Sequence, residues 1–159
     1  MTVEPQLAVV AEQADGLPLL VGILMGSESD METMRGAAGE LEQRGIGHEI
    51  RVISAHRQPD EVAEYARSAR SRGLRVLIAG AGLSAALPGV VAAHSDLPVI
   101  GVPLSSRLSA AGGLDAILSV LQMPPGVPVA AVGLDNARNA GVLAARIIDS
   151  AGGRQWSVA

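Results

Sequence analysis

A histidine and an arginine stand next to each other in the segment VISAHRQPDE, residues 52–61. An imidazole can take up and release a proton near neutral pH, and a guanidinium presents a planar fork of donors that fits a phosphate or a carboxylate. His56 and Arg57 closely follow an apolar run, so we expect them at the end of a strand. The pair suits proton transfer on an anionic substrate.

Small and polar residues also follow three other apolar runs. They read MGSESD at 25–30, GAGLSAALPG at 80–89 and VPLSSRLSAAGG at 102–113. Small residues let backbone N–H groups approach a ligand, and the N-termini of helices favour anions. Because ligands of doubly wound folds bind outside the carboxyl ends of the strands, we expect all four segments to meet on one rim.

Two of these segments also have a structural explanation. Ser27, Ser29 and Asp30 precede a helical pattern and are suitable N-cap residues, although a cap can still contact a ligand. GAGLSA, residues 80–85, fits the dinucleotide fingerprint G-x-G-x-x-G/A, but no acidic residue ends a following strand at the required distance. We therefore interpret these glycines as tight turns beneath a helix.

The remaining histidines do not indicate a metal centre. His48 opens a predicted strand, so we expect it at the surface or at a sheet edge, and His94 lies at a predicted helix end, where an imidazole can bind terminal carbonyls. No HxH, HExxH or paired-carboxylate spacing joins the three histidines. The sequence therefore predicts that the protein has no metal-binding site.

Strand and helix patterns alternate along the chain. Predicted strands cover 19–25, 48–53, 75–80, 98–103 and 128–134, and predicted helices cover 30–44, 59–73, 85–93, 114–121 and 136–149. Most strands are almost continuously apolar, which is typical of parallel strands covered on both faces. The alternation predicts an α/β fold with an open, doubly wound parallel sheet.

Length and composition limit the classes of protein to which the chain can belong. The 159 residues predict one domain over 18–150, between a loosely ordered leader at 1–17 and a tail at 151–159. The net charge of −4, the dispersed basic residues and the scarcity of aromatics argue against nucleic-acid binding. No apolar stretch reaches the roughly 18 residues of a membrane span. A chain without cysteine suits the cytoplasm.

Five segments together resemble the PurE family of purine biosynthesis. They are VGILMGSESDMETM, VISAHRQPDE, IAGAG with LPGVVAA, LPVIGVP and SVLQMPPGVPVA, spread over about residues 19–149. The family contains N5-carboxyaminoimidazole ribonucleotide mutases and aminoimidazole ribonucleotide carboxylases. The resemblance implies a three-layer α/β/α sandwich of the flavodoxin-like or Rossmann-like kind, a homo-octamer, and catalysis without metal or organic cofactor.

The resemblance also implies roles for individual residues. His56 would be the acid/base at ring carbon C4, Arg57 would bind the phosphate, and Ser27 and Asp30 would hold the phosphoribosyl group. The loop Gly80–Gly82 would enclose the imidazole and a bound CO2. The predicted substrate-binding set is Ser27, Ser29, Asp30, Ser54, Arg57, Gly80, Ala81, Gly82 and Ser84.

Some residues depart from the family pattern. Familiar bacterial mutases read GAGGAAHLPGM, whereas Leu83 and Ala86 stand here in place of a glycine and the histidine. The carboxylase class lacks that histidine and has a serine that Ser84 resembles, yet it typically reads SAHK rather than SAHR. Pro125 replaces the arginine of QMPRG. VGLDNARNAG resembles part of an enzyme that carboxylates a pyridinium mononucleotide.

Three hypotheses follow. The first is the mutase, which moves a carboxylate from the exocyclic nitrogen to C4. The second is a carboxylase or decarboxylase of aminoimidazole ribonucleotide or another heteroaromatic nucleotide, and the third is a non-catalytic nucleotide-binding paralogue.

We also expect the helix at 85–93 to lie between subunits, and Arg67, Arg70 and Arg72 to form one solvated helix face.

Overall fold

A computed structural model describes residues 10–13 and 16–152 of the chain. The strands are β1 (Val10–Gln13), β2 (Leu19–Met25), β3 (Gly47–Val52), β4 (Val76–Gly82), β5 (Val99–Leu104) and β6 (Ala130–Ala131). The helices are α1 (Met31–Gln43), α2 (Pro59–Ser68), α3 (Leu87–His94), α4 (Leu114–Leu121) and α5 (Ala137–Gly152). Short 3-10 turns η1 (Glu28–Asp30) and η2 (Ala110–Gly113) precede α1 and α4.

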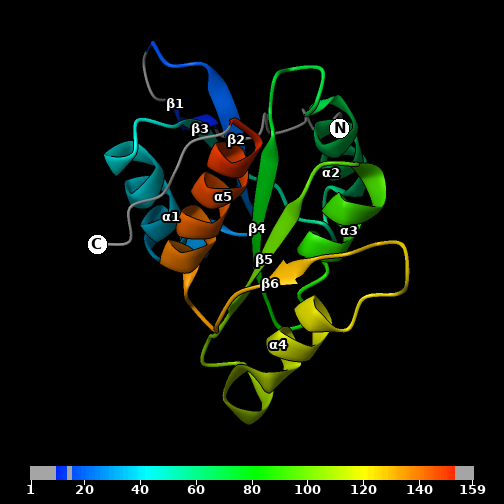
Figure 1. Ribbon diagram of the computed structural model, residues 1–159. Helices are drawn as coiled ribbons and strands as arrows, with labels where there is room; N and C mark the ends of the chain where they lie inside the picture. Colours follow the sequence, from blue (N-terminus) through cyan, green and yellow to red (C-terminus); the bar gives the residue numbers. More distant parts are fainter. Residues whose placement is uncertain (1–9, 14–15, 153–159) are drawn as a thin grey trace, which may run out of the picture.

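The strands form one sheet in the order β1-β3-β2-β4-β5-β6 (Figure 1). β1 pairs antiparallel with β3, and the other five strands run parallel. Among the parallel strands alone the order is 2-1-3-4-5, which is the flavodoxin-like arrangement. The chain reverses its direction of winding between β2 and β4, and folds of this kind bind ligands at that point.

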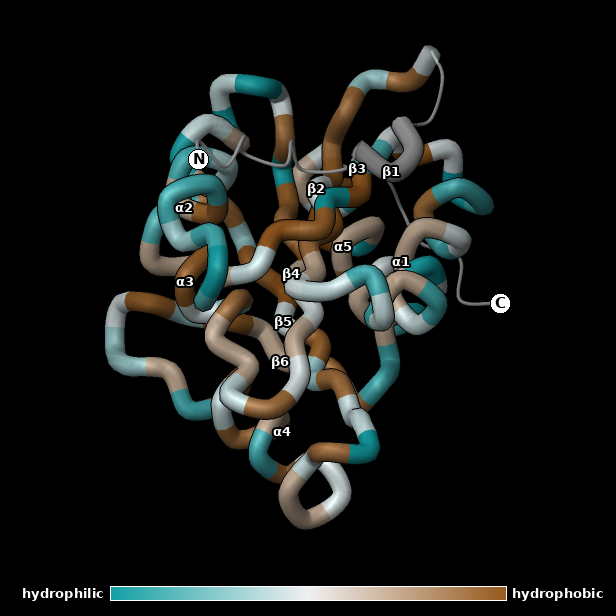
Figure 2. The backbone as a smooth tube through the Cα atoms, turned by 180° about the vertical axis from the view of Figure 1, so that it is seen from behind, coloured by the Kyte–Doolittle hydropathy of each residue, from teal (hydrophilic) through white to brown (hydrophobic). Residues whose placement is uncertain are grey.

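Helices cover both faces of the sheet. Val21, Ile23 and Met25 of β2 pack with α1 and α5, whereas Leu24 faces the side of α2 and α3. Figure 2 shows apolar segments concentrated on the strands, with hydrophilic segments on the surrounding helices and loops. The predicted α/β/α sandwich with a doubly wound parallel sheet is confirmed. No helix in the described part of the chain is long and apolar enough to span a bilayer.

Three segments differ from the predictions. β1 lies inside the predicted leader, so the expectation of loose structure is wrong for Val10–Gln13, and the rest of 1–15 lies outside the described residues. β6 covers only Ala130–Ala131 of the predicted strand at 128–134; Pro128, which has no N–H for strand pairing, lies before it. α5 continues to Gly152, and the tail beyond it also lies outside the description.

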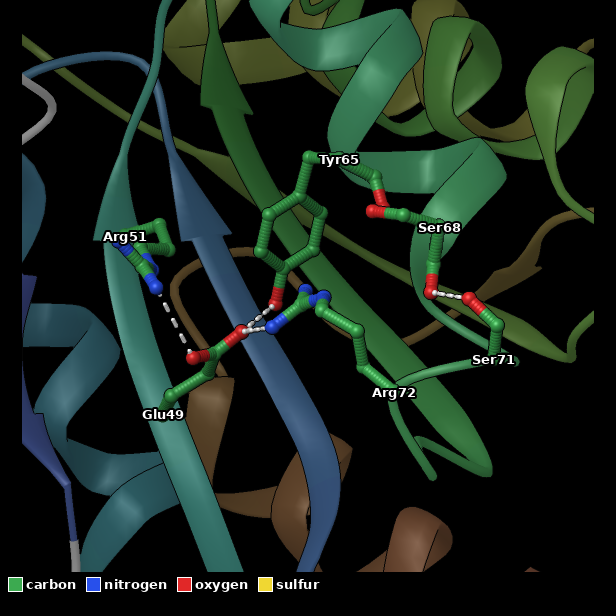
Figure 3. Close-up of polar contacts among 6 residues, drawn as sticks. All are labelled: Glu49, Arg51, Tyr65, Ser68, Ser71 and Arg72. Atoms are coloured by element: carbon green, nitrogen blue, oxygen red, sulfur yellow. Dashed lines mark hydrogen bonds and ion pairs between the residues drawn. The ribbon is translucent and has the colours of Figure 1, made fainter.

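The second predicted helix ends early, at Ser68. The hydroxyls of Ser68 and Ser71 donate to the carbonyl oxygens of Tyr65 and Ser68 at 3.3 and 2.9 Å, and such bonds compete with helical pairing (Figure 3). The chain then turns, so Arg72 does not share a solvated helix face with Arg67 and Arg70. That prediction is wrong for Arg72, which reaches back toward β3, and Arg70 is exposed but lies beyond the end of α2.

Arg72 belongs to a buried network around Glu49 (Figure 3). The guanidinium of Arg72 and the hydroxyl of Tyr65 donate to Glu49 Oε1 at 2.7 and 2.8 Å, and Arg51 donates to Oε2 at 3.2 Å. Gly22 on β2 makes room, because a Cβ there would lie 2.2 Å from the Tyr65 hydroxyl. The network fastens α2 to the sheet.

Burial alone would raise the pKa of Glu49, but the hydrogen bonds from Arg72 and Tyr65 and the charges of Arg72 and Arg51 outweigh it and lower the pKa. The same environment, burial first and then the Glu49 charge, raises the pKa of Tyr65. Glu49 therefore stays ionised inside the fold.

His48 is also placed differently from its prediction. It is buried on the sheet face that α1 covers, with Nδ1 3.2 Å from the carbonyl oxygen of Ile46 and Nε2 3.8 Å from Glu42 of α1. β3 is not an edge strand, because β1 pairs outside it. Both facts contradict a surface or edge position for His48.

Replacing Glu49 tests the network. Glu49→Gln should lower the free energy of unfolding by about 2 kcal/mol at neutral pH, less than for a fully buried ion pair because Arg72 is partly exposed. The folded pKa lies below the unfolded value of about 4.5, so the difference should be complete above that pH and disappear as the pH falls through the folded pKa.

Urea denaturation at neutral and acidic pH measures this effect. Asp96→Asn is the matched control, since its ion pair with Arg70 is exposed on both sides, and it should leave the midpoint unchanged. A loss of stability in Glu49→Gln that is equal at every pH would contradict the account.

Candidate active site

The four predicted segments meet in one pocket at the carboxyl edge of the parallel strands, around the switch point. It is lined by Gly26, Ser27, Ser29, Asp30, Ser54, Ala55, His56, Arg57, Ala81, Gly82, Leu83, Ala85, Ala86, Leu87, Leu104, Ser105 and Ser106. Each parallel strand from β2 to β5 delivers its following loop to this edge. The topology therefore assembles the pocket from residues up to 80 positions apart in the sequence, from Gly26 to Ser106.

The loop after β2 supplies hydroxyls and a carboxylate. Ser27 caps η1 by accepting a hydrogen bond from the backbone N–H of Ser29 at 3.3 Å, and the two hydroxyl oxygens lie 2.9 Å apart. Asp30 precedes α1 but makes no side-chain cap bond to it. Its carboxylate can therefore contact a ligand.

Asp30 is half-buried, and its electrostatics follow from that position. Burial raises the pKa of Asp30, a hydrogen bond with the backbone of Ser27 opposes the rise, and the negative charge of Asp135 adds to it. A partly desolvated carboxylate accepts hydrogen bonds from sugar hydroxyls more strongly than one in water.

The loop after β3 forms a tight corner around Ser54. The buried Ser54 accepts a bond from the N–H of Arg57 at 3.3 Å on its hydroxyl, and its carbonyl accepts one from the N–H of Gln58 at 2.8 Å. The side chain of Gln58 closes the corner by accepting from the N–H of Ser54 at 3.3 Å. Pro59 then starts α2, where its fixed φ suits the first turn.

This corner exposes His56 and Arg57 beside the first loop. The Arg57 guanidinium donates to the carbonyl oxygen of Gly26 at 3.3 Å, which joins the two loops. That contact uses one of its five N–H donors. A cationic fork and a titratable imidazole thus stand next to the hydroxyls of Ser27 and Ser29, an arrangement suited to a phosphate-bearing ligand.

The loop after β4 forms the apolar wall. Two predicted members of the site are not among the lining residues. Gly80 packs against α1, where a Cβ would lie 2.4 Å from the sulfur of Met34, and Ser84 is exposed outside the pocket. Gly80 thus serves packing, while Ala81 and Gly82 do line the pocket.

The same loop carries an unusual backbone. Leu83 and Ala85 have φ values of 53° and 32°, in the left-handed region that favours glycine. α3 consequently begins at Leu87 rather than at the predicted residue 85. Leu83 stays 42% exposed, so an apolar side chain borders the pocket where a family glycine would leave it open.

The loop after β5 adds residues that sequence reasoning missed. Ser105 and Ser106 line the pocket. Their segment was expected at the rim, and two serines directly after an apolar strand were the available signal. Asp135, which contacts Ser105 from the loop before α5, gave no local signal. Within residues 10–13 and 16–152, no cluster of three or more His, Cys, Asp or Glu side chains could hold a metal ion.

Fold and site together define a three-layer α/β/α protein with flavodoxin-like strand order and, at its switch point, a pocket whose serines and Arg57 suit an anionic ligand. Comparison with known proteins identifies the family. The chain matches the family described as AIR carboxylase over residues 20–156, and therefore belongs to that family, the PurE family of the sequence resemblance.

Individual proteins that resemble this chain carry names from the same family. The chain is 55% identical over 129 residues to an N5-carboxyaminoimidazole ribonucleotide mutase from Pyrococcus horikoshii, covering 81% of this chain and 72% of that protein. It is 54% identical over 129 residues to a phosphoribosylaminoimidazole carboxylase from Schizosaccharomyces pombe, covering 81% of this chain and 23% of that longer protein. The crystal structure of Treponema denticola PurE superimposes with a TM-score of 0.71 at 38% identity, covering 83% and 80% of the two chains.

Leu83 allows a test of the strained loop. Leu83→Gly should keep the free energy of unfolding or raise it by up to about 1 kcal/mol, because relief of left-handed strain exceeds or balances the greater freedom of glycine in the unfolded chain. Leu83→Val should lower it by about 1–2 kcal/mol, because a β-branched residue fits this region poorly.

Denaturation in urea measures both variants. Leu17 is the matched control: it is equally exposed and has no positive φ, so Leu17→Val should change little. If both Leu83 variants behaved like Leu17→Val, the left-handed conformation would carry no strain.

Proposed function

We propose that this protein is an N5-carboxyaminoimidazole ribonucleotide mutase of de novo purine biosynthesis. The observation that carries the proposal is the meeting of His56, Arg57 and the Ser27–Asp30 loop in one pocket, in a chain that is 55% identical to a named mutase over 81% of its length. We place its activity in the cytoplasm, as the absence of cysteine suggests.

The substrate would lie across the pocket. Its phosphate would bind the guanidinium of Arg57 and the hydroxyls of the first loop, and Asp30 would accept hydrogen bonds from the ribose. The imidazole ring would then face His56 on one side and the apolar wall on the other. Support comes from the composition of the lining, which is polar near Ser27 and apolar near Ala86 and Leu87.

The reaction would transfer the carboxyl group through CO2. The exocyclic N–C bond breaks, releasing CO2, and protonated His56 gives its proton to the nitrogen, which becomes the amine. C4 attacks the carbon of CO2, a C–C bond forms, and His56 removes the proton from C4 to restore the aromatic ring. The apolar wall would hold the uncharged CO2 and keep water away from it.

A carboxylase is the second candidate. Ala86 replaces the histidine of familiar bacterial mutases, and the chain is 54% identical to a named phosphoribosylaminoimidazole carboxylase. An assay separates the two: a mutase converts N5-carboxyaminoimidazole ribonucleotide without added bicarbonate, whereas a carboxylase needs aminoimidazole ribonucleotide and CO2. No conversion of either nucleotide, together with tight binding, would instead favour the non-catalytic paralogue.

We also propose an assembly of identical subunits, an octamer as the family resemblance implies. Leu114, Leu118 and Leu121 are 47%, 45% and 57% exposed on α4 at helical spacing, and Leu108 nearby is 69% exposed. Such an apolar helix face is typical of a subunit interface. This face supports α4 as a contact, in addition to the α3 contact predicted from the sequence.

Replacing His56 tests its role as the proton carrier. His56→Asn preserves size and some hydrogen bonding but cannot titrate, so turnover should fall about 10²-fold or more while the nucleotide still binds. Steady-state kinetics and calorimetry measure the two effects. His94→Asn is the control, because His94 lies at the far end of α3 next to Arg67. Near-full turnover in His56→Asn would contradict the acid/base role of His56 and leave anion binding as the only role of the His56–Arg57 pair.

Replacing Arg57 tests phosphate binding. Arg57→Lys keeps the charge but loses the bidentate fork, so KM should rise about tenfold with a smaller change in kcat. The exposed Arg75, before β4 at the opposite edge of the sheet, provides the control Arg75→Lys, which should leave KM unaltered. An unaltered affinity of Arg57→Lys for the nucleotide would remove Arg57 from the site.

Replacing Leu118 tests the assembly. Leu118→Glu places a charge on the apolar face of α4 and should dissociate the oligomer into smaller species, whereas Leu118→Met keeps the apolar surface and should not. Light scattering at micromolar concentration measures the mass of each. A stable monomer in the parent protein, or an unchanged mass in Leu118→Glu, would contradict the proposed contact.

A further inference from the structure

Asp135 connects two loops that lie thirty residues apart in the sequence. Its Oδ1 accepts a hydrogen bond from the backbone N–H of Ser105 at 2.8 Å, and its Oδ2 accepts another from the Ser105 hydroxyl. Ser105 and its neighbour Ser106 line the pocket. Both oxygens of one carboxylate thus hold a residue of the candidate active site.

The backbone of Asp135 is itself fixed. Its φ of 57° lies in the left-handed region, where aspartate and asparagine are much better tolerated than most residues. Its N–H donates to the carbonyl oxygen of Pro103 at 2.8 Å, at the end of β5. Directly after it, the side chain of Asn136 caps α5 by accepting from the N–H of Asn139 at 3.1 Å. The carboxylate is therefore presented from a rigid base.

The loop that it holds has only local bonds of its own among the described side-chain contacts. The N–H of Ser106 donates to the hydroxyl of Ser109 at 2.8 Å, and the N–H of Ser109 donates to the carbonyl of Ser106 at 3.1 Å. These bonds shape a turn, but they do not fasten it to the rest of the site. The two hydrogen bonds from Ser105 to Asp135 fasten the turn to the loop before α5.

We infer that Asp135 is a positioning residue of the active site: it holds Ser105 and Ser106 as the fourth wall against which the nucleotide binds. The inference rests on the proposed function. A hydroxyl that donates to a carboxylate keeps its acceptor lone pairs, so Ser105 can accept a hydrogen bond from a donor group of the nucleotide. Loss of the carboxylate weakens binding of the substrate rather than the chemical step.

Two variants of Asp135 separate the side chain from the backbone. Asp135→Gly keeps the left-handed conformation and removes the carboxylate. Asp135→Asn also keeps that conformation, and its amide can still accept from the N–H of Ser105 and donate to the Ser105 hydroxyl. The Asp135 charge is one of the causes that raise the pKa of Asp30, so its removal in either variant does not favour protonation of Asp30.

The experiment measures KM and kcat with 4-carboxy-5-aminoimidazole ribonucleotide in the reverse direction at neutral pH. Asp135→Gly should raise KM about tenfold with less than about a threefold change in kcat, since two hydrogen bonds to a charged group are lost. Asp135→Asn should recover most of this loss. Asp96→Asn, an exposed aspartate remote from the pocket, should match the parent.

Hydrogen exchange of the Ser105 amide gives a readout that does not depend on the reaction. It should be faster in Asp135→Gly than in the parent, and close to the parent in Asp135→Asn. If Asp135→Gly fails to fold, Ser105→Ala removes the hydroxyl contact alone and should raise KM several-fold in the same direction.

An unchanged KM in Asp135→Gly, an equal rise in Asp135→Asn, or a fall in kcat as large as the rise in KM would overturn the inference. A parent protein that neither binds nor converts the nucleotide would contradict the proposed function instead. In that case an unchanged exchange rate of Ser105 in Asp135→Gly would still overturn the positioning role.

Discussion

The parallel pairing of β2 with both β3 and β4 is the constraint on which the structure depends. Because the three strands point the same way, their following loops must emerge at one edge. The chain leaves β2 for α1 on one face of the sheet and leaves β3 and β4 for α2 and α3 on the other. The loops separate as they diverge, and the space between them becomes the pocket.

Two kinds of contact hold this edge in shape. Inside the fold, the ionised Glu49 joins β3 to Tyr65 and Arg72, so α2 is fastened at a distance from the site. The loop that leads into the other end of α2 carries His56 and Arg57. At the rim, hydrogen bonds connect neighbouring loops: one joins Arg57 to Gly26, and two join Ser105 to Asp135. The result combines a polar end that suits a phosphoribosyl group with an apolar end that suits CO2.

Local patterns predicted what depends on local physics. The strand at 19–25 and the helix at 114–121 have the predicted bounds, because continuous apolar runs and helical periodicity decide them. The meeting of the four rim segments was also predicted, since parallel strands put their following loops at one edge, although Gly80 and Ser84 do not line the pocket. Contacts between distant segments had no such signal. They include the hydrogen bonds of Ser105 with Asp135 and of Arg72 with Glu49, and the pairing of β1 with β3. The left-handed conformation of Leu83 likewise depends on neighbours that only the folded chain supplies.

The central claim is that this rim binds a phosphoribosyl imidazole with its reacting carbon against His56. A crystal structure of the protein with 4-carboxy-5-aminoimidazole ribonucleotide measures this directly. We predict the phosphate at Arg57 and Ser27, the carboxylate toward the apolar wall, and C4 within about 3.5 Å of an imidazole nitrogen of His56, as proton transfer requires. A nucleotide bound elsewhere, or bound in this pocket with C4 turned away from His56, would contradict the account.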